Sequence, residues 1–250
     1  MARHLIVEVV DSTNSEAGRL HAAGHRGPLW IMARAQAAGR GRHGRDWESP
    51  PGNLYATLLI TLAVPLAQAA QLAFVASLAM RDTVQALLPL PAPAIGLKWP
   101  NDVLIAGRKV SGILVETLQG ASDGGLTVAI GCGLNIVHAP AITRMPATCL
   151  ADHGAAPSAD LALDELTARM DVRLAQWQSG HGFPLIRDAW LAAAIGLSRD
   201  LTVVLDGHVV RGCFEGLDGD GALLLRLADG TLRPLHAGEV TFASPGRTLA

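Results

Sequence analysis

The sequence predicts an α+β domain with a mixed sheet, followed by a small β-barrel. Before residue 197, strand and helix patterns follow one another in mixed order, without the regular β–α repeat of a parallel fold. Half of the 250 residues are apolar, so a substantial core is expected. Beyond that point the chain changes to short strands with hairpin turns. We therefore expect a large domain at residues 1–197 and a small one at 198–250.

The first elements are indicated by apolar runs between polar turns. Leu5–Val10 has the apolar content of a strand. The polar run Asp11–Asn14 predicts a turn and helix cap, and Ser15–Ala23 a short helix. Leu29–Ala33 predicts a second strand, which leads into a loop rich in glycine and arginine.

An uncharged run, Ala56–Met80, is long enough for a membrane-spanning helix. However, Pro65 interrupts it, and two glutamines lie within it. Leu54–Ala63 is rich in leucine, threonine and isoleucine, as a buried strand would be. We therefore predict a strand, then an alanine-rich helix from Pro65 to Leu88, and no membrane segment.

The middle of the chain predicts a hairpin and a buried strand. The proline-rich stretch Pro89–Pro93 is expected to be a stiff connector. Val103–Ile105 and Val110–Leu118 are expected to pair around a turn at Ala106-Gly107. Leu126–Gly131 predicts the next buried strand.

The last third predicts two helices and then two hairpins. The helices are expected near Ala159–Gln178 and Pro184–Ala194. Leu201–Arg211 is centred on an Asp-Gly pair, and Ala222–Leu227 precedes a second one. Asp-Gly between apolar runs is a strong hairpin signal, which supports a separate β domain.

Charge and cysteine content restrict the class of protein. A formal net charge of −2 leaves no overall electrostatic footprint for nucleic acid or an anionic membrane. Cys132, Cys149 and Cys213 are an odd number without C-x-x-C spacing, which argues against disulfides and zinc, and the histidines lack metal-binding spacing. The N-terminal apolar run contains Glu8 and is too short for a signal peptide. We expect a cytoplasmic protein in which Cys132 is a core residue.

Lysine is nearly absent, and its two occurrences lie close together. Eighteen arginines carry the remaining positive charge, whereas Lys98 and Lys109 stand eleven residues apart, beside Asn101 and Asp102. A lysine ammonium is a compact point charge that the arginine fork does not reproduce. The clustering predicts a site for chemistry on a small anion.

The loop Gln36–Trp47 combines glycines with arginines. The glycines allow the backbone to approach a ligand, and Arg40, Arg42 and Arg45 are suited to phosphate or carboxylate. The loop is not a Walker A motif, because no Gly-Lys-Ser/Thr closes it, and it does not lead into a helix as a dinucleotide fingerprint does. It predicts an anion-binding loop, and a flexible basic loop is the alternative on composition alone.

Five motifs resemble, in order and approximate spacing, those of the biotin protein ligase family. They are Asp11–Asn14, Gln36–Tyr55, Lys98–Asp102, Arg108–Glu116 and Gly131–Asn135. The resemblance covers nearly the whole chain. It implies an α+β fold with a mixed-sheet catalytic domain of the class II synthetase-like biotin/lipoate ligase type, followed by an SH3-like barrel. Because the chain opens directly into the first strand, it resembles the ligase-only type, without a DNA-binding domain.

The activity that the resemblance implies has two steps. Biotin and ATP, accompanied by Mg²⁺, form biotinyl-5'-AMP and pyrophosphate, and a lysine of a biotin carboxyl carrier protein then receives the biotinyl group. The enzyme is expected to act as a monomer or homodimer, without nucleic acid or membrane. Two alternatives stay open: a lipoate or octanoate ligase or transferase, which shares the fold, and a non-enzymatic biotin sensor.

The resemblance also assigns residues to the biotin site. The set is Ser12, Thr13, Asn14, Gln36, Arg40, Gly41, Arg42, Lys109 and Gly112. The ureido ring of biotin needs neutral hydrogen-bonding groups, and its carboxylate needs a cation. Lys109 and Arg42 are expected to be catalytic, because the biotin carboxylate must approach an α-phosphate that is itself anionic.

A second set is assigned to ATP and the adenylate. It consists of Arg42, Arg45, Trp47, Asn101, Asp102, Lys109 and Asn135. Trp47 is expected to cover the adenylate, and the Asn135 amide to meet the adenine edge. Asp102 is expected to lie near the metal ion that accompanies ATP.

Some of these residues have structural interpretations as well. Ser12 and Asn14 are also expected to cap the helix that follows them. Trp99-Pro100 is expected to be core packing. Gly112 fits a strand position that a ligand or another backbone approaches closely, and a β-bulge would explain it equally.

Overall fold

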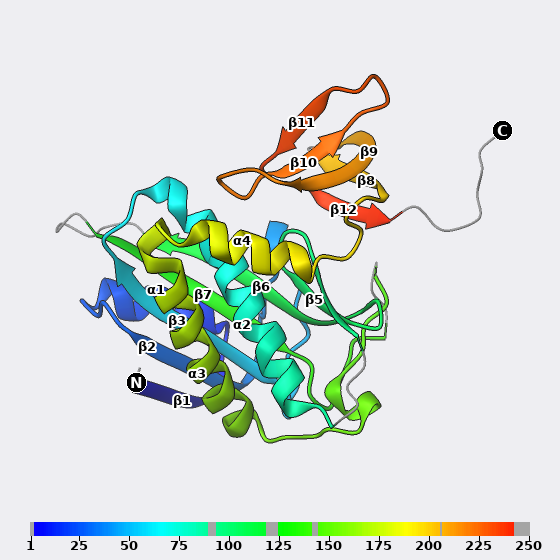
Figure 1. The fold of residues 1–250 in the computed structure, drawn as a ribbon. Helices are drawn as coiled ribbons and strands as arrows, with labels where there is room; N and C mark the ends of the chain where they lie inside the picture. Colours follow the sequence, from blue (N-terminus) through cyan, green and yellow to red (C-terminus); the bar gives the residue numbers. More distant parts are fainter. Residues whose placement is uncertain (1–2, 90–93, 119–124, 142–144, 206, 243–250) are drawn as a thin grey trace.

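The computed structural model describes residues 3–89, 94–118, 125–141, 145–205 and 207–242. They form a seven-stranded mixed sheet, helices on both of its faces, and a separate five-stranded antiparallel sheet (Figure 1). The smaller sheet comes from the C-terminal part of the chain and lies beyond α4 at one end of the larger domain. The predicted α+β class is confirmed.

The larger sheet has the strand order β1-β2-β3-β7-β6-β5-β4. The bounds of β1 to β7 are Arg3–Val10, Leu29–Gln36, Leu54–Leu62, Ile95–Lys98, Asp102–Ile105, Arg108–Leu118 and Leu126–Leu134. β1 is parallel to β2, and the other neighbouring pairs are antiparallel. The order places β3, β7 and β6 inside the sheet, where both faces are available for packing.

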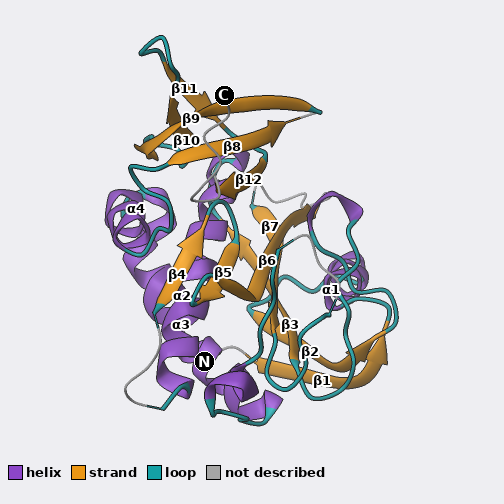
Figure 2. Cartoon of the chain, turned by 90° about the vertical axis from the view of Figure 1, so that its right-hand side faces the viewer, coloured by secondary structure: helices purple, strands orange, loops and turns teal. Residues whose placement is uncertain are grey.

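Side-chain alternation along β3 defines these two faces, because successive residues of a strand point in opposite directions. Leu54, Ala56 and Leu58 belong to the main hydrophobic core. Leu59 instead packs with α1 (Thr13–Ala22) in a smaller cluster. Figure 2 shows α1 on one side of the sheet and α2, α3 and α4 on the other.

The helical layer consists of α2 (Gln71–Leu87), α3 (Ala159–Trp177) and α4 (Phe183–Ala192). α2 is buried over most of its surface, because it packs against the sheet on one side and against α3 and α4 on the other. The indole N–H of Trp177 donates to Gln71 Oε1 at 2.8 Å, which satisfies both polar groups inside this layer.

The long uncharged run is therefore divided between a core strand and a core helix. α2 begins at Gln71 and not at Pro65 as predicted, because Leu66–Ala70 forms 3₁₀ turns after that proline. Within the described residues, none of the helices has both the length and the apolar character needed to cross a membrane.

The smaller sheet has the order β11-β10-β9-β8-β12. The bounds of β8 to β12 are Asp200–Leu205, His208–Leu217, Leu223–Arg226, Leu232–Leu235 and Glu239–Phe242. β8 pairs with β9 and β10 with β11, at the two predicted hairpins. The sheet contacts the larger domain at Gly221, whose carbonyl accepts a hydrogen bond from the indole of Trp99 at 3.3 Å. Trp99 is buried in the core, as predicted.

Two strands, β4 and β12, were not predicted. Each has four residues, which is too short for a pattern of alternation to be distinctive. They are strands because β5 and β8 supply the hydrogen-bonding partners. Of the connector expected at Pro89–Pro93, residues 90–93 lie outside the described residues.

The predicted caps of the first helix are confirmed in the position of Ser12 but not in its bonding, and not for Asn14. α1 begins at Thr13, so Ser12 occupies the N-cap position, but its side chain makes no capping hydrogen bond. Asn14 lies in the first turn, and its side chain donates to Glu116 of β6 at 2.7 Å. These polar side chains point into a cavity beside the sheet instead of bonding to the helix backbone.

Two glycines of the smaller sheet allow its contact with the helices to be tested. Gly221 and Gly230 have similar positive φ angles, +91° and +83°. A Cβ on Gly221 would lie 2.6 Å from the ring of Phe74, whereas a Cβ on Gly230 would meet no atom within 4 Å. Gly221→Ala should therefore lower the free energy of unfolding by about 1–3 kcal/mol more than Gly230→Ala, measured by urea unfolding. Equal losses would show that backbone strain alone sets the effect.

Candidate active site

A cavity of about 450 Å³ lies on the face of the larger sheet that carries α1. Its floor lacks side chains, because Gly112 of β6 and Gly131 and Gly133 of β7 lie there. All of the residues that the sequence assigned to the biotin and ATP sites line this one cavity. Its volume is typical of a site for a small organic ligand.

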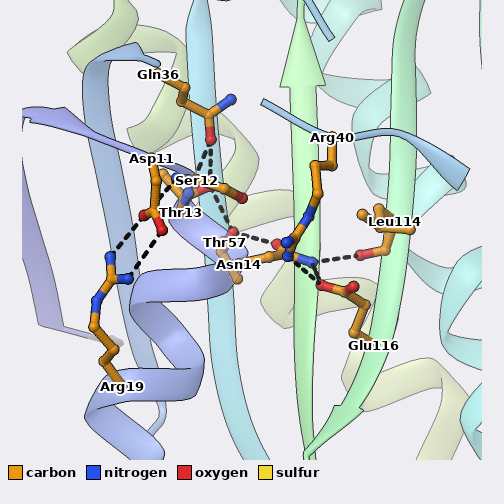
Figure 3. A network of polar contacts seen from close by, with 10 residues as sticks. All are labelled: Asp11, Ser12, Thr13, Asn14, Arg19, Gln36, Arg40, Thr57, Leu114 and Glu116. Carbon is orange, nitrogen blue, oxygen red and sulfur yellow. Dashed lines mark hydrogen bonds and ion pairs between the residues drawn. The ribbon is translucent and has the colours of Figure 1, made fainter. Parts of the chain in front are cut away.

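A network of hydrogen bonds orients the side chains at the α1 end of the cavity (Figure 3). The backbone N–H and hydroxyl of Thr13 donate to Gln36 Oε1 at 2.8 and 3.2 Å. The Thr57 hydroxyl donates to Asn14 Oδ1 at 2.6 Å. Asn14 Nδ2 in turn donates to Glu116 Oε2 at 2.7 Å. The orientation of each of these groups is therefore set by its neighbours within the protein.

Gly131 and Ser12 complete this end of the cavity. A Cβ on Gly131 would overlap with Asn14 Oδ1, so this position requires a glycine for Asn14 to keep its place. Ser12 is buried in the cavity wall, and its hydroxyl makes no hydrogen bond to another residue of the described part of the chain. That hydroxyl can donate to a ligand.

Arg40 reaches the same network from the loop after β2. Its Nη2 lies 3.9 Å from Glu116 Oε2, and its side chain is 46% exposed. Glu116 therefore connects Arg40 with Asn14 (Figure 3). The sequence did not assign Glu116 to the site, although its position four residues after Gly112 on one strand places both on the same face.

Trp47 covers the glycine floor. A Cβ on Gly133 would lie 2.7 Å from the indole, and a Cβ on Gly112 would lie 3.1 Å from it. Lys109 Nζ lies 5.3 Å from the ring centroid. The indole Nε1 is buried and has no hydrogen-bond partner among the described residues, so it is available to an acceptor on a ligand.

A β-bulge at Val110 brings Lys109 and Gly112 to the same face of β6. Asp102 of β5 opposes Gly112, and two residues later Leu104 opposes Lys109. Asp102 and Leu104 are two residues apart on β5, so they share a face, and their partners Gly112 and Lys109 share it too. In a regular strand, Lys109 and Gly112 are three residues apart and would lie on opposite faces. The Lys109 ammonium thus lies in the cavity, where it pairs with Asp102 Oδ1 at 2.6 Å. The close approach expected at Gly112 is confirmed, because the Trp47 ring and Lys109 Nζ lie against it, whereas the bulge lies at Val110 and not at the glycine.

The loop arginines are held by groups from other elements. Arg42 Nη1 donates to Asn101 Oδ1 at 3.3 Å, and burial lowers the pKa of the guanidinium. Arg45 pairs with Glu239 of β12. The smaller sheet therefore contributes to the cavity wall, which the sequence motifs did not indicate by residue.

The conformation of the loop depends on one glycine more than on the others. A Cβ on Gly39 would overlap with the carbonyl oxygen of Trp47 and with Ser49 Oγ, because the two ends of the loop touch there. A Cβ on Gly41 would make only an ordinary contact, 3.6 Å from the carbonyl oxygen of Arg45. Gly41 lines the cavity, but the space around it does not demand a glycine.

Asn135 and Cys132 are buried residues that also line the cavity. Asn135 is buried, and its Nδ2 already donates to the Thr148 carbonyl at 3.0 Å, which leaves its Oδ1 without a partner among the described residues. Cys132 belongs to the core, as predicted, and burial raises the pKa of its thiol to about 12. Such a thiol is not a nucleophile at neutral pH.

Two family models match the chain. Residues 6–135 match the model described as the biotin/lipoate A/B protein ligase family, and residues 201–242 match the biotin protein ligase C-terminal domain. The chain belongs to the biotin/lipoate A/B protein ligase family. The first match contains all of the predicted site residues, and the second covers most of the smaller sheet.

Curated members of the family are similar over most of their length. The biotin–[acetyl-CoA-carboxylase] ligase of Paracoccus denitrificans is 40% identical, over 93% of this chain and 97% of the relative. The Mycobacterium tuberculosis protein of that name is 33% identical, over 84% and 77%. The bifunctional ligase/repressor BirA of Escherichia coli is 30% identical, over 96% of this chain and 74% of the relative.

Solved structures of family members have the same fold. A biotin protein ligase from Aquifex aeolicus in complex with biotin and ATP has a TM-score of 0.77 and 25% identity, over 96% of this chain and 98% of that one. A biotin protein ligase from Leishmania major in complex with biotinyl-5-AMP has a TM-score of 0.66 and 25% identity, over 94% and 99%. The likeness thus includes both sheets.

Tyr55 provides a test of burial at the cavity wall, because it is the one tyrosine of the chain. Its hydroxyl donates to the Pro50 carbonyl at 2.8 Å, and burial raises its pKa from 10.0 to about 12. The neutral phenol therefore stabilises the fold below pH 10, and this contribution should be lost as the pH rises from 10 to about 12. An ultraviolet absorbance titration measures the ionisation, with Tyr55→Phe as baseline. A midpoint near pH 10 in protein that circular dichroism shows to be folded would contradict the prediction.

Proposed function

We propose that this protein is an ATP-dependent biotin protein ligase, which forms biotinyl-5'-AMP and transfers the biotinyl group to a lysine of a biotin carboxyl carrier protein. The observation that carries the proposal is a single cavity with a neutral hydrogen-bonding end, a cationic end, and Lys109 between them. Neutral donors and acceptors suit a ureido ring, and cations suit a carboxylate and phosphates. The names and bound molecules of the relatives support the same assignment.

The neutral end favours biotin over lipoate or octanoate. A ureido ring presents one carbonyl acceptor and two N–H donors. The Ser12 hydroxyl can donate to the carbonyl oxygen, and the oxygens of Thr13 and Asn14 keep lone pairs for the N–H groups. A dithiolane ring or an alkyl chain would leave the Ser12 hydroxyl unpaired and would offer no N–H group to Thr13 and Asn14, which is unfavourable.

Lys109 and Arg42 serve the first step. A carboxylate oxygen of biotin forms a bond to the α-phosphorus of ATP, and the bond from phosphorus to the bridging oxygen breaks, which releases pyrophosphate. Two anions must meet for this reaction, so cations that line the cavity between them lower the repulsion and stabilise charge on the phosphoryl oxygens. The ion pair with Asp102 holds the Lys109 ammonium in place. Arg40 lies toward the biotin carboxylate.

The second step requires that the adenylate stays dry until the carrier arrives. The lysine amine of the carrier attacks the carbonyl carbon of the mixed anhydride, an amide forms, a proton is released and AMP leaves. Water would hydrolyse the same anhydride. Trp47 covers the glycine floor, and its loop is joined to the smaller sheet through Arg45 and Glu239, so these groups exclude water.

The remaining groups suit the nucleotide and its metal ion. Asn135 Oδ1 would accept from the adenine amino group, since its Nδ2 is already used. The described residues contain no group of three metal-ligating side chains, but the Asp102 carboxylate and Asn101 lie among the cations of the cavity. This set fits Mg²⁺ that is bound mainly by phosphates and water, with one carboxylate. When bound, the ion would neutralise phosphate charge.

The setting of the enzyme is part of the proposal. Residues 1–197 would form the catalytic domain and residues 198–250 the domain that completes the ATP site. The partner would be a biotin carboxyl carrier protein in the cytoplasm, and the net charge of −2 supports the absence of a nucleic-acid partner. A biotin sensor would have no use for Lys109 in the cavity, which argues against that alternative.

Biotin-dependent release of pyrophosphate from ATP tests the function, and Lys109→Ala tests the mechanism. The wild type should release pyrophosphate with biotin but not with lipoate or octanoate. Lys109→Ala should slow this release by about 10²–10³-fold, the usual effect of removing one donor to a transition-state oxyanion. Lys109→Arg should not restore it, because the fork does not reproduce a point charge.

The neighbouring exposed cation supplies the control for this experiment. Arg108→Ala should leave the rate nearly unchanged. Near-wild-type release by either Lys109 variant would refute its role. Biotin binding without pyrophosphate release by the wild type would instead indicate a sensor.

Arg42→Gly should weaken retention of the adenylate. Arg42 is the half-buried arginine of the loop and bonds to Asn101, so it is placed to hold the phosphate of biotinyl-5'-AMP. Released adenylate acylates amines without selection. The variant should therefore biotinylate a lysine-rich bystander protein more than the wild type does, with a faster off-rate of the adenylate. Equal bystander labelling and an unchanged off-rate would show that Arg42 does not retain the intermediate.

A further inference from the structure

Lys98, the second of the two lysines, has no role in the mechanism above. It is the last residue of β4, is only 8% exposed, and lines the cavity. Its ammonium makes no ion pair or hydrogen bond with another residue of the described part of the chain. A buried charge without a partner is costly, and proteins normally pair such charges. The arrangement indicates that an anion from outside the described chain completes the pair.

The other cations of the cavity differ from Lys98 in this respect. Each has a polar or acidic partner within the protein: Lys109 has Asp102, Arg42 has Asn101, Arg45 has Glu239 and Arg40 has Glu116 at longer range. Burial lowers the pKa of Lys98, while Asp102 and Glu239 raise it and Lys109 and Arg45 lower it. The two nearby carboxylates already form ion pairs, Asp102 with Lys109 and Glu239 with Arg45. The Lys98 ammonium therefore keeps an unused donor.

The position of Lys98 specifies which part of ATP it would meet. Across the sheet, the cavity runs from Tyr55 of β3 and Gly131 of β7, through Lys109 of β6 and Asp102 of β5, to Lys98 of β4. Lys98 opposes Asp102 in the β4–β5 pairing, so it lies one strand farther from the neutral end than the carboxylate that holds Lys109. If the α-phosphate is bound at Lys109, the next phosphates lie on the Lys98 side.

We propose that Lys98 binds the β- and γ-phosphates of ATP and stabilises pyrophosphate as it leaves; the inference rests on the proposed ligase function. As the bond from the α-phosphorus to the bridging oxygen breaks, its electron pair stays on that oxygen, so negative charge grows on the departing pyrophosphate. An ammonium held in a desolvated site interacts strongly with that charge. The ion pair also accounts for a buried lysine that has no partner within the described residues.

Lys98→Met tests this role, because methionine keeps an unbranched apolar stem and removes the charge. We expect biotin-dependent pyrophosphate release to fall about 10–100-fold in kcat/KM for ATP, with the KM for biotin unchanged. Transfer to a carrier from biotinyl-5'-AMP that is added ready-made should stay within about twofold of wild type, because pyrophosphate takes no part in that step. This second assay also shows that the variant is folded.

A direct binding measurement supplies a readout besides activity. Calorimetric titration with inorganic pyrophosphate should show binding to the wild type that is weakened at least about tenfold by Lys98→Met. Arg108→Met, which removes an exposed cation from the neighbouring hairpin, should bind pyrophosphate as the wild type does.

Four outcomes would overturn the proposal. They are unchanged pyrophosphate release by Lys98→Met, unchanged pyrophosphate binding, an equal loss in both half-reactions, and a rise in the KM for biotin alone, which would place Lys98 at the carboxylate. Failure of the wild type to release pyrophosphate would refute the ligase function itself, so the two failures are distinguishable.

Discussion

Alternation of side chains along β6 and β7, and its interruption at Val110, control the geometry of the site. Glycines on one face of these strands leave a floor against which a ligand or the Trp47 ring can lie. The bulge then turns Lys109 to that same face, beside Gly112. Without the extra residue the ammonium would point into the core under α2, where no anion could reach it. The placement of the central cation beside the glycine floor and its tryptophan cover therefore depends on one irregularity in one strand.

The cations of the cavity are held by carboxylates and amides that come from other elements. Asp102 holds Lys109, and Glu239 holds Arg45. Such pairs keep desolvated charges in place before a ligand binds, and an incoming phosphate can take over part of the pairing without large rearrangement. Lys98 differs because the described protein supplies no partner for it. Lys109 and Arg45 are therefore positioned by the protein before a ligand binds, whereas Lys98 has a free donor for an anionic ligand.

The smaller sheet is part of the site as well as a separate layer. Its strand β12 carries Glu239 to the loop that contains Arg45, while Gly221 accepts a hydrogen bond from Trp99 and packs against Phe74 of α2. These contacts anchor the sheet next to the cationic end of the cavity. The sheet contacts the helical layer through Gly221 and forms an ion pair with the loop through Glu239. The position of the loop therefore depends on the position of this sheet.

The sequence by itself determined the α+β class, most of the helices and long strands, the two hairpins of the smaller sheet, and many of the residues that line the cavity. These follow from local periodicity, from Asp-Gly turns and from motifs that are contiguous in the chain. Short strands such as β4 and the orientation of Ser12 and Asn14, predicted as caps, depended on partners far away in sequence. Only the tertiary structure decided that Glu116 and Glu239 join the site, that Lys109 shares a face with Gly112, and that Lys98 lacks a partner among the described residues. Strand register and contacts between distant elements set these features, and no local pattern contains that information.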